Sequence, residues 1–148
     1  MPDVTEDARI PLQISRNCIV ASVQLDLRPD VLASLRTDLL DLLGKSGAQA
    51  VVIDLSGLQT IDREEFEALR RTSDMARLMG ARSVLSGLTP GVVSSLVDLD
   101  VNLIDVEATR TLDAAFALIE AEPSARAPTR RTHLAILDFD DADDFDPE

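Results

Sequence analysis

The sequence is poor in the residues that most often build catalytic, metal or nucleic-acid sites. It has one cysteine, Cys18, one histidine, His133, and neither Trp nor Tyr, and aromatic residues make up 3% of it. A lone cysteine forms no internal disulfide, which is typical of a reducing compartment. One Cys and one distant His predict no zinc site. Without aromatic platforms, stacking on RNA or single-stranded DNA is not expected, and Cys18 is expected to be a small core residue.

Basic charge is also scarce. The chain has 27 Asp and Glu against 14 Lys and Arg, a formal net charge of −13, and Lys45 is its single lysine. Phosphate backbones and anionic membranes bind clustered basic residues, so this composition argues against both. No apolar run reaches the roughly 18 residues of a membrane span, and no signal segment opens the sequence. We expect a cytoplasmic protein whose partners are proteins, with no nucleic acid and no membrane.

The residues needed for catalysis do not occur together. His133 lies in an acidic C-terminal region, so a Ser–His–Asp arrangement has no base. The glycines are isolated and match no phosphate-binding loop. A phosphoacceptor receiver domain would need an acidic pair after the first strand, which here ends Ile14-Ser15-Arg16, and a lysine late in the chain. We expect no enzymatic activity, metal or cofactor, and we interpret Asp54 as a strand-end residue that binds loop amides.

Hydrophobic periodicity predicts alternating strands and helices over residues 10–120. Alternation over 10–14 and over Cys18–Leu25, with a turn at Arg16-Asn17, predicts an antiparallel hairpin. The run Ala50–Leu55, apolar on both faces, predicts a buried parallel strand, and short strands are predicted at 82–86 and 103–106. Apolar stripes predict helices at about 32–43, 62–79, 90–97 and 112–119. Predicted N-caps are Asp62, Thr89, and Thr109 or Thr111.

This order of elements predicts one α/β domain with a mixed β-sheet, in which an initial antiparallel hairpin is followed by parallel strands. Residues 1–9 are predicted to be a flexible N-terminus. Residues 121–148 are predicted to be a linker and an acidic tail. The last part, His133–Glu148, has seven acids and no Lys or Arg among five large apolar residues. It is interpreted either as a disordered, solubilising tail or as a docking peptide that orders on a basic groove.

Function is expected at the strand–loop–helix junction of residues 51–65, VVIDLSGLQTIDREE. In open α/β folds, ligands and partners meet the protein outside the carboxyl ends of the strands. A helix N-terminus at that place also presents unpaired N–H groups. Asp62 is expected to cap the helix, while Glu64 and Glu65 complement its dipole.

Three segments together resemble the STAS domain family, most closely its RsbS-type stressosome antagonists. They are VVIDLSGLQTID at 51–62, ARLMGAR at 76–82 and SVLSGLTPGVV at 83–93, and the resemblance covers about residues 10–120. It implies about four helices, mainly on one face of the sheet. It also implies a non-catalytic anti-sigma factor antagonist that forms homo- or hetero-oligomers with other STAS-domain subunits and binds a serine/threonine kinase or a downstream regulator.

The resemblance further implies a phosphorylated Ser or Thr directly after Asp62, where this sequence has Arg63, and arginine accepts no such phosphate. Either Glu64 and Glu65 keep the surface permanently acidic, or the subunit is a constitutive scaffold. The expected partner-binding residues are Ser56, Gly57, Thr60, Asp62, Arg63, Glu64 and Glu65. The hydroxyls considered for phosphorylation, each otherwise an ordinary loop, strand-end or helix-face group, are Thr60, Ser86, Ser94 and Ser95. The alternative is a small-ligand or nucleotide-binding STAS module that uses amides near Gly57 and Asp62.

Overall fold

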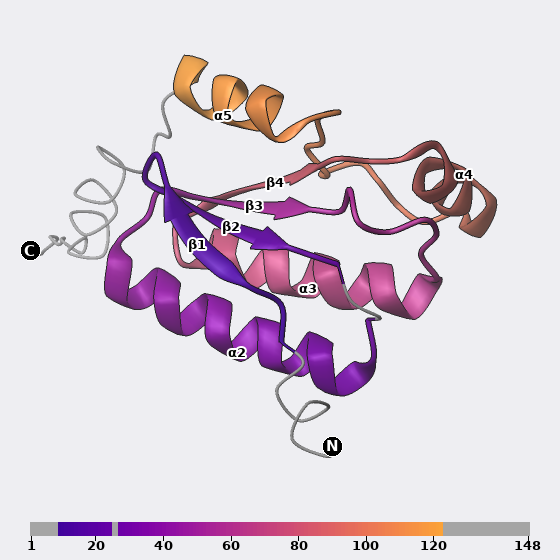
Figure 1. Ribbon diagram of the computed structural model, residues 1–148, viewed down its shortest axis with the longest axis horizontal. Helices are drawn as coiled ribbons and strands as arrows, with labels where there is room; N and C mark the ends of the chain where they lie inside the picture. The colour runs from indigo at the N-terminus through magenta and orange to yellow at the C-terminus, as the bar shows by residue number, and fades with distance from the viewer. Residues whose placement is uncertain (1–8, 25–26, 123–148) are drawn as a thin grey trace, which may run out of the picture.

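The computed structural model describes residues 9–24 and 27–122, which form a four-stranded sheet with four helices (Figure 1). The strands, in their order across the sheet, are β1 (Leu12–Ser15), β2 (Cys18–Ser22), β3 (Ala50–Asp54) and β4 (Arg82–Ser86). The helices are α2 (Pro29–Ser46), α3 (Arg63–Leu78), α4 (Pro90–Leu99) and α5 (Leu112–Ala121). β1 pairs antiparallel with β2, and β2–β3 and β3–β4 are parallel, so the predicted mixed sheet is confirmed.

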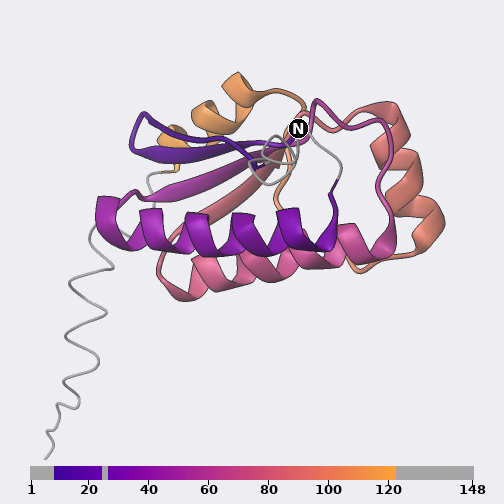
Figure 2. The same ribbon diagram turned by 60° about the horizontal axis from the view of Figure 1, so that its bottom comes forward.

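The helices lie in layers around this sheet. α2 and α3 lie side by side on one face, α5 covers the opposite face, and α4 lies beyond the end at which β3 and β4 finish (Figures 1 and 2). Within residues 9–24 and 27–122, no helix combines the length and the apolar character needed to cross a bilayer. Of the predicted N-terminus, residues 1–9, the structure describes only residue 9. Of the predicted linker and acidic tail, residues 121–148, it describes only residues 121 and 122.

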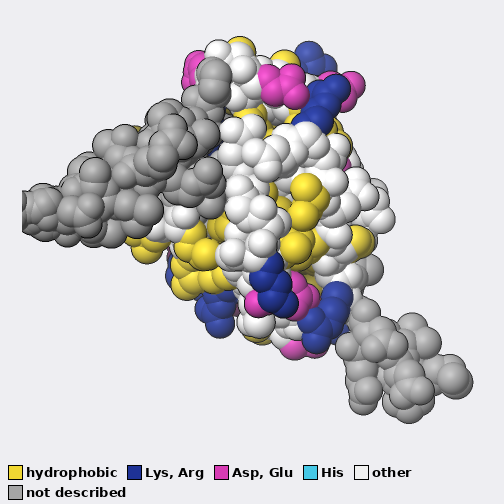
Figure 3. All heavy atoms as spheres, turned by 90° about the vertical axis from the view of Figure 1, so that its left-hand side faces the viewer, with side chains coloured by type: hydrophobic (Ala, Val, Ile, Leu, Met, Phe, Trp, Pro, Cys, Tyr) yellow, Lys and Arg dark blue, Asp and Glu magenta, His cyan; other side chains and the backbone are white. Residues whose placement is uncertain are grey.

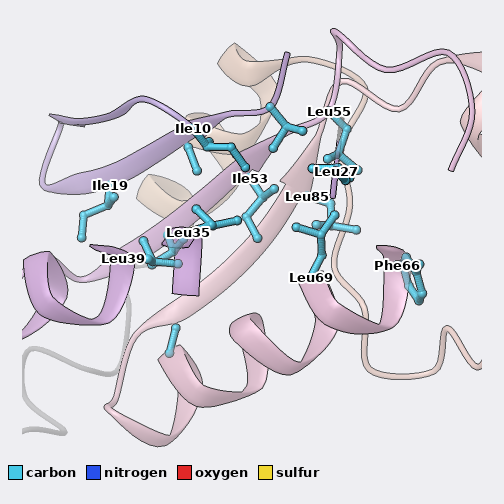
Figure 4. Close-up of a cluster of buried hydrophobic side chains, with 14 of the residues drawn as sticks. Ile10, Ile19, Leu27, Leu35, Leu39, Ile53, Leu55, Phe66, Leu69 and Leu85 are labelled. Carbon is cyan, nitrogen blue, oxygen red and sulfur yellow. The ribbon is translucent and has the colours of Figure 1, made fainter. Parts of the chain in front are cut away.

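Two apolar clusters hold the layers together. Ile19 and Ile53 of the sheet pack with Leu35 and Leu39 of α2 on the side of α2 and α3 (Figure 4). Burying each such side chain contributes about 1.5–3 kcal/mol before entropy is counted. The α5 side has its own cluster, which includes Cys18 at 1% exposure and Ile119. The prediction that Cys18 is a core residue is confirmed.

Local sequence explains where the elements begin and end. Arg16 and Asn17 have φ values of 55° and 62°, the left-handed pair that suits a two-residue hairpin turn. The Thr89 side chain accepts a hydrogen bond from the Val92 N–H, and Pro90 is the first residue of α4, as predicted. The second strand ends at Ser22 and not at Leu25, because the chain must leave the sheet to reach α2.

The strand predicted at residues 103–106 is wrong. These residues form a turn closed by the Val106 N–H and the Leu103 carbonyl, and a single parallel bridge joins Leu85 to Ala108. Three arginines of α3, seven residues apart, donate hydrogen bonds to backbone carbonyls before and within this turn. Arg63 donates to Leu99, Arg70 to Asn102 and Arg77 to Asp105. The pairing with β4 is made by the residues just after the predicted strand, since the Leu85 N–H donates to the Glu107 carbonyl and the Leu85 carbonyl accepts from the Thr109 N–H.

Candidate functional site

The junction after β3 is fixed by the side chain of Asp54. Its Oδ1 accepts a hydrogen bond from the Ser56 N–H at 3.0 Å, which confirms its predicted role of binding a loop amide. In the register of the sheet, Asp54 is paired with Ser22 of β2 and Ser86 of β4. Gly87 follows with φ 71°, and a Cβ there would lie 2.5 Å from Asp54 Oδ1. The turns after β3 and β4 thus touch, and the contact requires glycine.

The loop between β3 and α3 is also anchored from the α4 side. Thr89 Oγ1 donates to the Leu58 carbonyl at 3.2 Å. A Cβ on Gly91, in the first turn of α4, would lie 2.1 Å from the Gln59 carbonyl oxygen. Ile61, at the end of the loop, is only 4% exposed. The loop backbone is therefore anchored from two sides, whereas Ser56, Gly57 and Thr60 remain at the surface.

A reciprocal pair of hydrogen bonds starts α3. The Asp62 carboxylate accepts from the Glu65 N–H at 2.8 Å, and Glu65 Oε1 accepts from the Asp62 N–H at 2.9 Å, which is a capping box. The predicted cap at Asp62 is confirmed. Glu65 is half-buried and belongs to the cap, while Asp62, Arg63 and Glu64 are exposed in the same turn.

Arg63 connects this turn to α4. Its guanidinium donates to the Leu99 carbonyl, the last residue of α4, and lies 3.8 Å from the Glu67 carboxylate. Cations are favourable at helix C-termini and unfavourable at N-termini. The Arg63 guanidinium therefore extends away from the N-terminus of α3, where a cation is unfavourable, to the C-terminus of α4, where it is favourable. The sequence signal for this contact is the seven-residue spacing of the arginines on α3.

A groove of about 570 Å³ lies between the N-terminal halves of α2 and α3. Its apolar lining includes Leu32 of α2 and Ala68 of α3, and both signs of charge line it. The charged lining residues are Arg28, Arg36, Asp62, Glu64, Glu65, Glu67 and Arg71. The structure thus brings three predicted site residues together in this groove, while Ser56, Gly57 and Thr60 do not line it. Its volume is within the range of small-molecule pockets.

The four candidate hydroxyls differ in exposure. Thr60 and Ser94 are exposed, and Ser95 is half-buried and donates to the Gly91 carbonyl at 2.9 Å. Ser86 is fully buried, and its Oγ has no hydrogen-bond partner among the described residues. A kinase can therefore reach Thr60 and Ser94 in this conformation, whereas Ser86 would require the junction to open.

The shortest ion pair among the described residues is formed by Arg82, at the start of β4 and away from the tip of α3. Arg82 contacts Glu107 at 2.6 Å and Glu122 at 3.0 Å. Hydrogen bonding by Arg82 lowers the pKa of Glu107, and burial raises the pKa of the Cys18 thiol. In the described parts of the chain, no group of three or more His, Cys, Asp or Glu side chains is placed to hold a metal ion.

Comparison with known proteins identifies the family. The model of the STAS domain matches residues 9–122. The RsbT co-antagonist protein RsbRA of Bacillus subtilis is 31% identical over 75 residues, covering 51% of this chain and 27% of RsbRA, so the chain spans about a quarter of that relative.

Solved structures have the same fold. An RsbS variant from Moorella thermoacetica superposes with a TM-score of 0.67 at 22% identity, covering 77% of this chain and 97% of that one. An anti-sigma factor antagonist from Thermotoga maritima gives 0.61 at 18% identity, covering 75% and 94%. With the family model matching from before β1 to the end of α5, the chain belongs to the STAS domain family.

Proposed function

We propose that this protein is a non-enzymatic scaffold of an RsbS-like, stressosome-type signalling complex in the cytoplasm, an anti-sigma factor antagonist acting through protein contacts. Its partners would be other STAS-domain subunits, in homo- or hetero-oligomers, and a serine/threonine kinase or downstream regulator. The likeness to RsbRA supports this class of function. The contact surface would be the loop and first turn of α3, from Ser56 to Glu65.

The observation that carries the proposal is an exposed, charged helix tip on a loop that is anchored by hydrogen bonds and close packing. Asp62, Arg63 and Glu64 are exposed, while the backbone beneath them is held by the capping box and by the close contacts at Gly87 and Gly91. A surface that needs no ordering on association loses little conformational entropy when it binds. Such a tip is suited to protein recognition.

Arg63 determines how this surface would be regulated. It stands where the family resemblance places a phosphorylated hydroxyl, and its guanidinium is engaged with the Leu99 carbonyl. We infer a constitutive scaffold, because the position can neither gain nor lose a phosphate charge. If a hydroxyl elsewhere takes over the switch, the exposed Thr60 at the tip and Ser94 on α4 are better placed than Ser95 or Ser86.

The sharpest test is a charge reversal at Glu64, which lies in the first turn of α3 and is not part of the capping box. Glu64→Lys should weaken co-purification with related STAS subunits and lower the mass of the complex. Asp113→Lys is the matched control, because Asp113 is an exposed acid in the first turn of α5. Unchanged association of the Glu64 variant, with partners present, would refute the proposal.

The second candidate is a small-ligand or nucleotide-binding module, and the 570 Å³ groove with its three arginines favours it. One amide considered for this role, the Asp62 N–H, is already bound to the Glu65 side chain, so the groove is the better location. Titration of the protein with nucleotides separates the two functions. Saturable binding at micromolar concentrations that is lost in Arg36→Ala would favour the second candidate.

A further inference from the structure

Two arginines in the groove between α2 and α3 form no ion pair among the described residues. Arg36 of α2 and Arg71 of α3 both line it. Over residues 9–24 and 27–122, neither forms an ion pair, in contrast to Arg28, which is paired with Asp30. Like charges beside one groove raise the electrostatic energy, and an anion placed between them lowers it. The middle of the groove is therefore suited to carboxylates.

The charge of the groove changes along its length. α2 and α3 lie side by side and start at the same end of the molecule (Figures 1 and 2). All four acids that line the groove lie at this starting end, from the cap of α3 to four residues into the helix, and they are Asp62, Glu64, Glu65 and Glu67. The last of them, Glu67, lies 3.8 Å from Arg63. Arg36 and Arg71 lie seven and eight residues into their helices, or roughly 10–12 Å along at 1.5 Å per residue. An acidic segment would be repelled at the starting end and held in the middle.

Beyond the arginines, the end of α3 is apolar. Leu78 is 85% exposed and Met79 is 42% exposed. Figure 3, which views the end of the molecule where α2 and α3 finish, shows hydrophobic side chains at the surface beside Lys and Arg side chains. A segment that binds both the arginines and the apolar end of α3 would combine carboxylates with large apolar residues and have few basic groups.

We propose that the C-terminal segment of this same chain, His133–Glu148, docks in this groove. Its seven acids would lie on Arg36 and Arg71, and its apolar residues against Leu78 and Met79. It has no Lys or Arg. Its large apolar residues are Leu134, Ile136, Leu137, Phe139 and Phe145.

The chain leaves the described part near the C-terminal end of α3, the end opposite to the acidic start of the groove. Glu122 is bound to Arg82 through its carboxylate at 3.0 Å and its carbonyl at 3.2 Å, and Arg82 is only three residues after Met79. The ten residues 123–132 can span up to about 33 Å, whereas α3 is about 24 Å long. The segment therefore reaches the groove from the apolar end.

A segment that enters from the C-terminal end of α3 stops before the tip of this helix, because Asp62 and Glu64 repel the acids of residues 133–148. The inference is therefore independent of the proposed function, and it is tested without any partner. Hydrogen–deuterium exchange of the full chain measures it directly. Amides of residues 134–145 should exchange about 5–10-fold more slowly than in an unstructured peptide, because docking protects them from solvent.

A matched pair of variants locates the contact. The double variant Arg36→Glu and Arg71→Glu should return these amides to the unstructured rate. The control, Arg9→Glu with Arg110→Glu, makes the same change of net charge at exposed positions outside the groove and should keep the protection. Should the groove variant fail to fold, Asp138→Asn with Asp140→Asn and Asp141→Asn tests the same contact from the segment and should also abolish protection.

Three results would overturn the proposal. The first is unstructured exchange of residues 134–145 in the parent protein. The second is protection that survives both the groove variant and the segment variant. The third is protection that rises with protein concentration, because capture by a second copy is concentration-dependent and docking within one chain is not.

Discussion

Arg63, in the first turn of α3, donates a hydrogen bond to the backbone carbonyl of Leu99 at the end of α4. The contact joins the N-terminus of one helix to the C-terminus of another, 36 residues apart in the sequence. Arg63 is thus a structural link, and under the proposed function it also stands where a phosphorylated hydroxyl is expected. Its substitution should affect both the phosphorylation of the tip and the position of α4.

Arg63→Ser is expected to create a site that a cognate serine/threonine kinase labels, while the parent tip stays unlabelled. A phosphate at the first residue of α3 would be stabilised by the helix dipole and by the exposed N-terminal N–H groups. Labelling with radioactive ATP followed by peptide mapping checks this. Arg77→Ser is the matched control, since it removes another arginine of the same stripe without placing a hydroxyl at the tip. Phosphate on Thr60 of the parent protein would contradict the prediction.

Gly87→Ala should destabilise the fold by about 2 kcal/mol or more, because alanine is strained at positive φ and its Cβ would overlap Asp54 Oδ1. Gly44→Ala is the matched control. Gly44 lies within α2, where a Cβ meets only Met79 Cε at 3.7 Å, and alanine should add about 0.5–1 kcal/mol through helix propensity. Urea unfolding measures both. Equal stability of the Gly87 variant and the parent would show that the two turns do not touch.

Much of the fold could be predicted from the sequence because local signals agreed with the tertiary packing. The two-sided apolar run 50–55 suited a buried parallel strand, and caps predicted at Asp62, at Thr89 and at Thr109 or Thr111 marked helix starts, of which the last proved to be Thr111. Residues 103–106 have the same apolar character as a strand. In the structure the bonds to β4 come from Glu107 and Thr109, and the position of this pairing along the chain is decided by tertiary contacts that the apolar pattern of 103–106 does not contain.

The local structure of the junction at the candidate site could be predicted in part. The sequence located the junction at residues 51–65 and the cap at Asp62. It did not show that Glu65 completes the cap or that Ser86 is buried. The groove was not predictable, because Arg36 and Arg71 come from helices that are adjacent only in the folded sheet.

Acid should weaken the fold through Glu107. The Arg82 guanidinium lowers the pKa of this carboxyl from its ordinary value of 4.5, so the unfolded state binds protons more readily than the folded state. The stabilisation is complete above pH 4.5 and is lost as the pH falls through the lower, folded pKa. Glu107 is 42% exposed, so solvent screening keeps the effect modest.

Glu107→Gln tests this acid dependence, since a glutamine does not titrate. The variant should be less stable than the parent at pH 7, and the difference should shrink between about pH 5 and 3. Urea unfolding at each pH measures it. Glu120→Gln, which removes the exposed carboxylate 3.8 Å from Arg16, is the control. A difference that stays constant over this range would show that Glu107 does not titrate with folding.

Deleting His133–Glu148 should leave the domain folded, because the family match and the last helix end at residues 122 and 121 and both apolar clusters lie before them. A segment docked on the surface contributes on the order of 1 kcal/mol, so the melting temperature should fall by less than about 5 °C. Deleting residues 112–148 also removes Phe116 and Ile119 from the core on the α5 side. That truncation should lower the melting temperature much further, since large buried side chains are lost. If both truncations lower it equally, the last sixteen residues are part of the core.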